Sequence, residues 1–350
     1  MKFLSCQVSY LNHLIKVTWD IALTYVSEDI PSPGIKGKEH EQMTLDIKGD
    51  TATSLVLWAS GNRADVLVEG EEIHLFIPGR WRLGQKAVRS VVPGDKVMLR
   101  RETGKWRMIR RLPRKNEFTR RMPGTRKNIP QTIAANIDRV IIVASSANPT
   151  TPNGLIDRLL VTAMLGGVPP VLLVNKIDLA TADRLSSLQR VYKNAADGVF
   201  FTSAVTGVGV DDLSRLIYSG ITLLAGSSGV GKSTLINLID PDLDLKTGEI
   251  SRATGKGRHI TSEARLHRLK SGGWIIDTPG LRECEPWRMT RPILGGCFRE
   301  FEKLTSGCHF RDCLHDQETG CAVKLAVGTD VLPEERYLSY LKLLHEVRSE

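Results

Sequence analysis

The sequence contains no long apolar run, which argues against a helical membrane protein. No stretch of the 350 residues approaches the roughly 18 consecutive apolar side chains that a membrane-spanning helix requires. The first 26 residues also lack a continuous apolar core, because polar residues such as Lys16 and Asp20 interrupt it. We therefore expect no signal or transit peptide. Residues 1–42 are interpreted as an N-terminal extension, and Met43 offers an alternative start for the working chain.

Cysteine is scarce and unevenly placed, which argues against a disulfide-stabilised protein. Only six cysteines occur, and three of them, Cys308, Cys313 and Cys321, fall within fourteen residues. A histidine lies between them. Such clustering indicates a metal site in a reducing compartment rather than a disulfide framework. We therefore expect a cytoplasmic protein that has no membrane partner.

Acidic residues are few where basic residues concentrate. The chain carries a formal net charge of +9, but the stretch from Arg100 to Lys127 holds twelve Lys or Arg against two Glu, a net of +10. This stretch is either a solvated, disordered linker or a strip that contacts phosphates. The second interpretation rests on the counterions that clustered basic residues release from a polyanion. Trp106 and Phe118 could then stack on bases.

The first part of the chain shows short β-type runs broken by glycine and proline. Examples within residues 43–113 are Thr53–Trp58, Ala64–Val68 and Lys96–Arg100. Several short strands at close spacing predict a small β-barrel. An OB-fold fits best, although strand propensity does not separate it from an SH3-like barrel. A basic linker over residues 114–132 follows.

After the linker, strands and helices alternate. Val140–Ala144 and Val171–Val174 have the composition of buried strands, and a helical segment lies around Asp157–Leu165 between them. This alternation predicts an α/β domain with a parallel sheet over residues 133–285. Residues 286–350 are expected to form a mostly helical domain that contains the Cys/His cluster.

The strongest motif is a glycine-rich phosphate loop. It follows the apolar run Ile221–Ala225 and precedes a helix-like stretch, Thr234–Ile239, which is the context that the motif requires. Its glycines let backbone N–H groups turn toward phosphate oxygens, its lysine can reach the terminal phosphates, and its last serine can ligate Mg²⁺. The matching residues are Gly226, Ser227, Ser228, Gly229, Val230, Gly231, Lys232 and Ser233. The motif predicts a nucleoside triphosphate site without specifying the base.

A second motif, at the end of a predicted strand, indicates which base is bound. Asn175, Lys176 and Asp178 resemble the N-K-x-D guanine motif of GTPases. A carboxylate at Asp178 can accept hydrogen bonds from the ring N–H and the exocyclic amine of guanine, whereas adenine offers no such donor pair. The Lys176 stem can cover the base, and Asn175 can tie the strand end to the phosphate loop. Ser203 and Ala204 resemble the S-A segment that backs the base.

Two further segments resemble the switch regions of GTPases. Asp277 and Gly280 fit D-x-x-G, in which the carboxylate holds Mg²⁺ through water and the glycine N–H senses the γ-phosphate. Thr261 is the candidate switch threonine for Mg²⁺, although its loop could be a plain solvated turn. Leu281 stands where many GTPases place a glutamine, and an apolar side chain cannot orient water. His259 is the nearest candidate for that role; alternatively it contacts phosphate or RNA, or only packs.

The order of these motifs is a rotation of the usual one. GTPases ordinarily run phosphate loop, switch threonine, D-x-x-G, N-K-x-D and S-A, whereas here the last two come first. The chain therefore leaves the nucleotide-binding core directly after the second switch. The C-terminal part is attached to the element that moves on hydrolysis.

The Cys/His cluster has a composition suited to zinc. Cys308, Cys313, His315 and Cys321 offer three thiolates and one imidazole, which suit one tetrahedral structural Zn²⁺ without an open position. His309 is a rival ligand, but a residue adjacent to Cys308 binds the same ion with difficulty. A reduced, cysteine-rich helical corner is the alternative.

Taken together, the barrel, basic linker, rotated motifs and Cys/His spacing resemble the RsgA (YjeQ/YloQ) family of small-subunit GTPases over roughly residues 45–347. The resemblance implies an OB-fold, a circularly permuted GTPase domain and a zinc-binding domain. It assigns the phosphate role to Gly226–Thr234, with Thr234 as its last member. It also implies that a monomer binds GTP, GDP, the small (30S) ribosomal subunit and its rRNA. GTP hydrolysis would then accompany late subunit maturation and release of the protein.

The first forty or so residues do not resemble the family, and the switch segments leave alternatives open. Family members often carry a run of threonines after the switch histidine, whereas Ile260, Thr261 and Ser262 stand here, so this chain departs from the family pattern at the expected Mg²⁺ ligand. Because of Leu281, the protein could instead be a nucleotide-gated RNA-binding scaffold with vestigial hydrolysis. A GTPase for the large subunit is a third interpretation, but such proteins usually lack both the barrel and the zinc cluster.

Overall fold

A computed structural model describes residues 47–48, 50–82, 91–124, 129–245, 263–281 and 283–347, and all of them belong to one compact unit, Leu45–Glu350. The candidate residues His259 and Thr261 lie outside the described residues. Within those ranges, no helix combines the length and apolar character needed to cross a bilayer.

The first sheet of this unit is an antiparallel half-barrel. Its order is β4-β3-β2-β5-β6, and β1 pairs with β2. Gly61 and Gly70 have positive φ values of 58° and 85°, which allow the tight turns between β2, β3 and β4. The predicted N-terminal β-barrel is therefore confirmed. The elements are β1 (Ile47–Lys48), β2 (Thr51–Ser60), β3 (Arg63–Val68), β4 (Glu71–Phe76), the 3-10 helix η1 (Gly79–Arg82), β5 (Lys96–Glu102) and β6 (Lys105–Arg111).

A two-stranded ribbon follows the half-barrel and begins within the basic stretch. It consists of β7 (Glu117–Arg121) and β8 (Pro130–Ala135). The guanidinium group of Arg114 binds the carboxylate of Asp95 through Nε at 2.7 Å and Nη2 at 2.8 Å, and that of Glu117 at 2.7 Å. The prediction that Phe118 stacks on bases is wrong, because its ring is fully buried in the hydrophobic core.

The central sheet is the α/β part that the sequence predicts. Its order is β11-β10-β9-β12-β14-β13, with β13 antiparallel at one edge and the other strands parallel. Apolar residues on both faces of β9 and β10 are typical of a parallel sheet covered on both sides. The strands are β9 (Arg139–Ser145), β10 (Pro170–Asn175), β11 (Val199–Phe201), β12 (Ile221–Ala225), β13 (Arg265–Arg268) and β14 (Trp274–Asp277).

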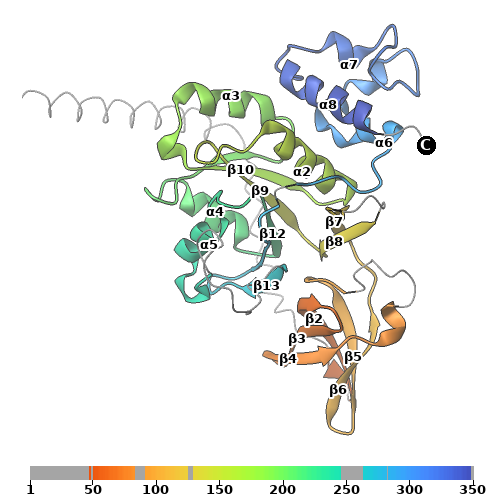
Figure 1. Ribbon diagram of the computed structural model, residues 1–350, viewed down its shortest axis with the longest axis vertical. Helices are drawn as coiled ribbons and strands as arrows, with labels where there is room; N and C mark the ends of the chain where they lie inside the picture. Colours follow the sequence, from red (N-terminus) through yellow and green to blue (C-terminus); the bar gives the residue numbers. More distant parts are fainter. Residues whose placement is uncertain are drawn as a thin grey trace, which may run out of the picture. The chain divides into compact units, whose positions relative to one another are not determined.

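Helices cover both faces of this sheet. Figure 1 shows α2 and α3 on one side and α4 and α5 on the other, and the two faces form separate apolar clusters. The helices are α2 (Asn153–Leu165), η2 (Ile177–Leu179), α3 (Ala182–Tyr192), α4 (Val210–Ile217), α5 (Lys232–Ile239) and η3 (Pro241–Leu243).

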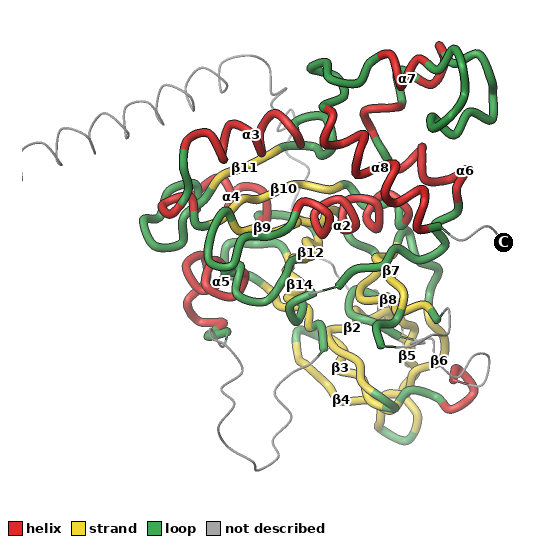
Figure 2. The backbone as a smooth tube through the Cα atoms, turned by 45° about the horizontal axis from the view of Figure 1, so that its top comes forward, coloured by secondary structure: helices red, strands yellow, loops and turns green. Residues whose placement is uncertain are grey.

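The C-terminal part consists of short helices and loops followed by one longer helix, as Figure 2 shows. Its apolar core includes Phe298, Phe301 and Tyr340 together with Val161 of α2. The helices are α6 (Arg291–Leu294), η4 (Gly295–Cys297), η5 (Arg299–Phe301), η6 (Thr305–Gly307), α7 (Ala322–Leu325) and α8 (Glu334–Glu346).

A buried ion-pair network joins α8 to the central part. Arg336 of α8 bonds Glu300 of η5 through Nε at 2.6 Å and also bonds Asp157 of α2. Its guanidinium carbon lies 4.5 Å from the centre of the Phe298 ring and 5.5 Å from that of Tyr192. The C-terminal part is thus attached to the nucleotide-binding core through a desolvated charge cluster.

Candidate functional site

The segments predicted to bind a nucleotide meet at one edge of the central sheet. The parallel strands β10, β12 and β14 end at Asn175, Ala225 and Asp277, and the motifs begin at these ends. Parallel strands of α/β sheets bind their ligands at this carboxyl edge. Segments that lie far apart in the sequence are therefore brought together.

The phosphate loop connects β12 to the first turn of α5. Gly231 has a φ of 99°, and a Cβ atom there would lie 2.3 Å from Nδ2 of Asn175. A Cβ atom on Gly280 would lie 2.4 Å from the backbone nitrogen of Ser228, so the D-x-x-G segment touches the loop directly. Both positions require glycine because no side chain fits. Gly226, Ser227, Gly229 and Val230 complete the loop, and Ser233 and Thr234 lie in the first turn of α5.

Lys232 lies inside the loop that it closes. Its Nζ donates hydrogen bonds to the carbonyl oxygens of Gly226 at 2.9 Å and Ser227 at 3.0 Å. Burial lowers the pKa of Lys232, and the nearby Asp277 carboxylate opposes that shift. The ammonium group is therefore held within the cradle where a phosphate would need a counter-charge.

Asn175 links the N-K-x-D segment to the glycine-rich loop. Its Nδ2 donates to the carbonyl oxygen of Val230 at 2.8 Å, and its Oδ1 accepts from the backbone N–H of Ala204 at 3.3 Å. The Ser203 hydroxyl donates to Oδ1 of Asp178 at 2.5 Å. The exposed Asp178 carboxylate is thereby oriented beside the loop. One buried amide thus joins three motifs.

The loop after β9 contributes contacts that sequence analysis missed. The Ser146 hydroxyl donates to the carbonyl oxygens of Asn175 at 3.1 Å and Lys176 at 2.8 Å. Lys176 Nζ in turn donates to the carbonyl oxygen of Asn148 at 2.5 Å. These residues directly follow the predicted strand Val140–Ala144. Their position at a strand's carboxyl end was the available signal.

The D-x-x-G segment is fixed to the neighbouring strand and loop. The Thr278 hydroxyl donates to the carbonyl oxygen of Leu224 at 2.7 Å, and the N–H of Leu281 donates to that of Gly226 at 2.9 Å. The Leu281 side chain is only 3% exposed and packs in the hydrophobic core. It therefore does not reach the solvent side of the site.

The Asp277 carboxylate has the properties of a group that can bind a cation. Its Oδ1 is buried and has no hydrogen-bond partner among the described residues. Burial raises the pKa of Asp277, while the Lys232 ammonium and the N–H of Thr278 oppose the rise. An unpartnered buried oxygen is costly unless a ligand satisfies it. A hydrated Mg²⁺ fits this requirement.

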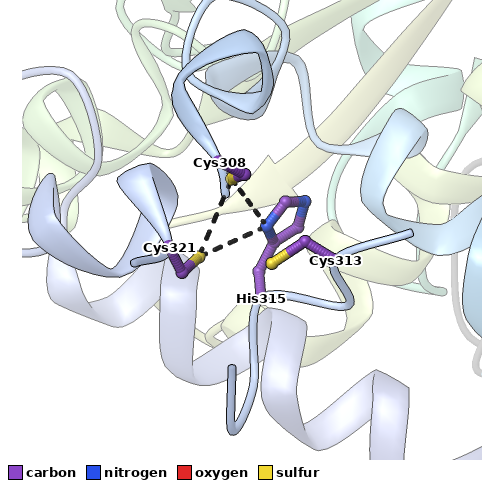
Figure 3. A group of neighbouring side chains, drawn as sticks. All are labelled: Cys308, Cys313, His315 and Cys321. Atoms are coloured by element: carbon purple, nitrogen blue, oxygen red, sulfur yellow. Dashed lines mark hydrogen bonds between the residues drawn. The ribbon is translucent and has the colours of Figure 1, made fainter. Parts of the chain in front are cut away.

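The Cys/His cluster predicted for zinc is assembled in the C-terminal part. Figure 3 shows Cys308, Cys313, His315 and Cys321 turned toward a common point. Their potential ligand atoms all lie within 4.8 Å of one another, and Nδ1 of His315 lies 3.4 Å from Sγ of Cys321 and 3.6 Å from Sγ of Cys308. The rival His309 is exposed and does not belong to this group. The cluster is consistent with a zinc site.

Neighbouring groups hold the histidine in place. His315 has a left-handed backbone conformation with a φ of 57°, and its carbonyl oxygen accepts the Tyr337 hydroxyl at 2.8 Å. The Glu318 carboxylate accepts the N–H groups of Leu314 at 2.7 Å and Asp316 at 2.9 Å on either side. Burial lowers the pKa of His315, with Glu318 opposing, which favours the neutral imidazole that a metal requires.

Burial has the opposite consequence for a cysteine of the cluster. It raises the pKa of Cys313 to about 12, so that the thiolate is disfavoured without a nearby cation. A Zn²⁺ ion supplies the charge that stabilises thiolates. The types of ligand, the distances between them and their electrostatics therefore fit Zn²⁺.

Comparison with known proteins agrees with this geometry. Residues 111–287 match the protein family described as RsgA GTPase. The small ribosomal subunit biogenesis GTPase RsgA of Gemmatimonas aurantiaca is 36% identical over 301 residues, which cover 85% of this chain and 98% of that protein. The protein of the same name from Shewanella oneidensis is 34% identical over 306 residues, covering 85% of this chain and 84% of the relative.

Two solved structures are also similar. The crystal structure of YjeQ from Thermotoga maritima has a TM-score of 0.67 and 31% identity, covering 85% of this chain and 98% of that one. That of YloQ, described as a circularly permuted GTPase, has a TM-score of 0.63 and 27% identity, covering 89% and 98%. The shared rotation of motifs, the half-barrel, the Cys/His cluster and the sequence identity show that this chain belongs to the RsgA family of circularly permuted GTPases.

Proposed function

We propose that this GTPase acts in late maturation of the small ribosomal subunit and leaves the subunit after hydrolysing GTP. The observation that carries the catalytic part is the convergence of three motifs around Asn175, in rotated sequence order, at one edge of the sheet. The ribosomal part rests on the relatives, which are named small ribosomal subunit biogenesis GTPases. We propose a monomer that works in the cytoplasm.

Guanine is read by the segment that follows β10. The Asp178 carboxylate, which Ser203 orients, accepts the ring N–H and the exocyclic amine of the base. The Lys176 stem covers one face, and the backbone at Ala204 backs the other side. Asn175 keeps this segment at a fixed place relative to the phosphate loop. Adenine lacks the donor pair, so it is rejected because the Asp178 carboxylate would not receive the two hydrogen bonds that guanine supplies.

The phosphates occupy the cradle formed by Gly226–Thr234. Backbone N–H groups at the start of α5 bind phosphate oxygens and gain from the helix dipole. Lys232, which bonds two loop carbonyls in this structure, exchanges them for the β- and γ-phosphates. Mg²⁺ would be held by the Ser233 hydroxyl, by Asp277 through water, and by Thr261. When bound, Mg²⁺ neutralises charge that develops on the phosphate oxygens.

Hydrolysis needs a water molecule aligned with the γ-phosphate. The N–H of Gly280 contacts that phosphate and reports its presence to the second switch. Since the side chain of Leu281 is buried, another group must orient the water. We assign this role to His259. A contact made by the ribosomal subunit then brings the catalytic groups into place, so we expect slow turnover by the protein alone and faster turnover with the subunit.

The C-terminal cluster is assigned one structural Zn²⁺, held by Cys308, Cys313, His315 and Cys321. Four protein ligands leave no open position, so the metal stabilises the fold and takes no part in hydrolysis. The hydroxyls of Tyr337 and Tyr340 on α8 donate to the carbonyl oxygens of His315 in this cluster and of its neighbour Leu314, and Arg336 connects the same helix to Asp157 of α2. The zinc therefore also fixes the surface that this part presents to a partner.

Ribosomal RNA is assigned to the β5–β6 hairpin of the half-barrel. Exposed basic side chains lie along it, and the Arg101 guanidinium carbon lies 5.6 Å from the centre of the Trp106 ring. Clustered basic residues bind phosphates through counterion release, so this contact should weaken steeply with added salt. The exposed basic residues of the hairpin are Lys96, Arg100, Arg101, Lys105, Arg107, Arg110 and Arg111.

Nucleotide specificity tests the catalytic assignment. Asp178→Asn should reduce the preference for GTP over ATP by about 100-fold or more, because the carboxylate that accepts both hydrogen bonds from the base is lost. Asp183→Asn, an exposed carboxylate on α3, is the matched control and should leave it unchanged. Unaltered discrimination in Asp178→Asn would remove the base assignment.

Binding to ribosomal subunits tests the biological assignment. In sedimentation with purified subunits, the protein should accompany small subunits in the presence of a non-hydrolysable GTP analogue and dissociate in the presence of GDP. Equal binding to large subunits, or binding that ignores the nucleotide, would contradict the proposal.

A further inference from the structure

The half-barrel covers the edge strand of the GTPase sheet. Strand β2 is buried on both of its faces, because Val56 packs inside the half-barrel while Leu55 and Leu57 join the core of the central sheet. Leu266 of β13 belongs to the same core, and β2 lies against β13. The edge of the sheet nearest the D-x-x-G aspartate is thus in contact with the half-barrel.

Charged residues complete this contact. Nη1 of Arg265 on β13 bonds Oδ2 of Asp65 at 2.8 Å, and Nη2 bonds Glu72 of β4. The Arg265 side chain is 28% exposed, compared with 9% for Asp65 and 38% for Glu72. His74 approaches the other oxygen of Asp65 at 2.5 Å. Two carboxylates and an imidazole thus gather here, but the guanidinium group already serves as their cation.

The strand register places Arg265 beside the nucleotide site. Arg265 lies directly opposite Asp277 in the antiparallel pair formed by β13 and β14. Directly opposite residues project on the same face with Cβ atoms about 4.5–5.5 Å apart. An arginine side chain spans that distance easily. Oδ1 of Asp277 is buried and has no hydrogen-bond partner within the described ranges, so it is a strong acceptor for a guanidinium group.

We propose that Asp65 and Glu72 are positioning residues for the nucleotide site: they hold the Arg265 guanidinium group at the half-barrel and keep it from pairing with Asp277. Asp277 then stays available for hydrated Mg²⁺. A partner that displaces the half-barrel from β13 releases Arg265 toward Asp277 and weakens nucleotide binding. The half-barrel is in this way coupled to the GTPase site. This inference rests on the proposed Mg²⁺ role of Asp277.

The test measures binding rather than turnover. The affinity of a fluorescent, non-hydrolysable GTP analogue is measured with MgCl₂ and with EDTA, and the ratio gives the enhancement by Mg²⁺. The variants are Asp65→Asn/Glu72→Gln, Arg265→Gln and the triple variant that combines them. Arg268→Gln is the matched control, because this arginine is on the same strand but stacks on Trp274 at 5.9 Å.

The inference predicts a ranking of the variants, by their enhancement by Mg²⁺, that a purely structural contact would not produce. The double variant should lose the enhancement by Mg²⁺ on the order of tenfold, as is typical when a group that supports a metal is altered. Arg265→Gln, Arg268→Gln and the triple variant should stay within about twofold of the wild type, because removing the arginine removes the competitor. A simple structural clamp would instead impair Arg265→Gln and the double variant alike.

Different results would contradict the inference and the proposed role of Asp277. A triple variant as impaired as the double variant, or a double variant like the wild type, would overturn the inference. Wild-type affinity that ignores Mg²⁺ would instead refute the proposed role of Asp277. Thermal unfolding checks that each variant is folded. If the double variant is unstable, Glu72→Gln alone, which alters an exposed carboxylate, replaces it. This variant should show a smaller loss of the enhancement by Mg²⁺, and adding Arg265→Gln should reverse that loss.

Discussion

The Arg336→Met variant should lose several kcal/mol of folding free energy, because it leaves two carboxylates buried without their cation. The Arg336 side chain is 1% exposed, and those of Asp157 and Glu300 are 2% and 0% exposed. Methionine preserves much of the apolar length that lies between Tyr192 and Phe298 but carries no charge. Breaking a buried pair from one side costs about 3–5 kcal/mol.

The magnitude can be measured by urea unfolding at a fixed zinc concentration, followed by the fluorescence of the aromatic residues. A second variant identifies the cause. Adding Asp157→Asn and Glu300→Gln to Arg336→Met removes the stranded charges, and it should recover at least half of the lost free energy. Recovery would show that uncompensated charge, rather than a cavity, is the source of the loss.

An exposed ion pair between α3 and α8 supplies the control. Arg190 pairs with Glu335, the neighbour of Arg336, and both side chains are more than 40% exposed. Arg190→Gln should therefore cost at most about 1 kcal/mol. Equal losses in Arg190→Gln and Arg336→Met, or no recovery in the triple variant, would refute the reasoning.

Three further perturbations test separate parts of the structure. Asn175→Ala removes the hydrogen-bond partner of the buried Val230 carbonyl and of the partly buried Ala204 N–H, and it should cost about 1–3 kcal/mol, measured by unfolding, with weaker GTP binding. The hydrogen bond with Asp65 raises the pKa of His74 above 6.5. The stability that this bond contributes is present below pH 6.5 and is lost as the pH rises through the raised pKa of His74. In Asp65→Asn, NMR titration should show the pKa of His74 return toward its ordinary value. Metal analysis should find about one equivalent of zinc in the wild type and none in Cys321→Ser. Cys297→Ser, which alters a buried cysteine outside the cluster, should keep the zinc.

Much of the fold follows from local patterns in the sequence. The apolar runs Val140–Ala144 and Val171–Val174 are strands because both faces of a parallel sheet are buried, and the glycine loop after Ile221–Ala225 requires a strand before it and a helix after it. The spacing of Cys308 and Cys321 likewise indicated a shared ligand set. The domain boundaries and the roles of individual site residues stay predictions.

Contacts between distant segments could not be predicted. Phe118 lies in a basic stretch, yet its ring is buried because β7 pairs with β8 and packs against α2. The pairing of Arg265 with Asp65 joins residues 200 positions apart and depends on how the half-barrel meets the sheet. The buried network of Arg336 depends in the same way on tertiary packing. No periodicity or motif in the sequence predicts such contacts between distant segments.

The central claim is that the small ribosomal subunit controls GTP hydrolysis by this enzyme. The most direct test measures the turnover of GTP by the purified protein alone, with small subunits and with large subunits, using Lys232→Ala as the inactive control. The account predicts slow turnover alone, strong stimulation by small subunits only, and none in Lys232→Ala. Unstimulated turnover, or stimulation by large subunits to the same extent, would contradict it.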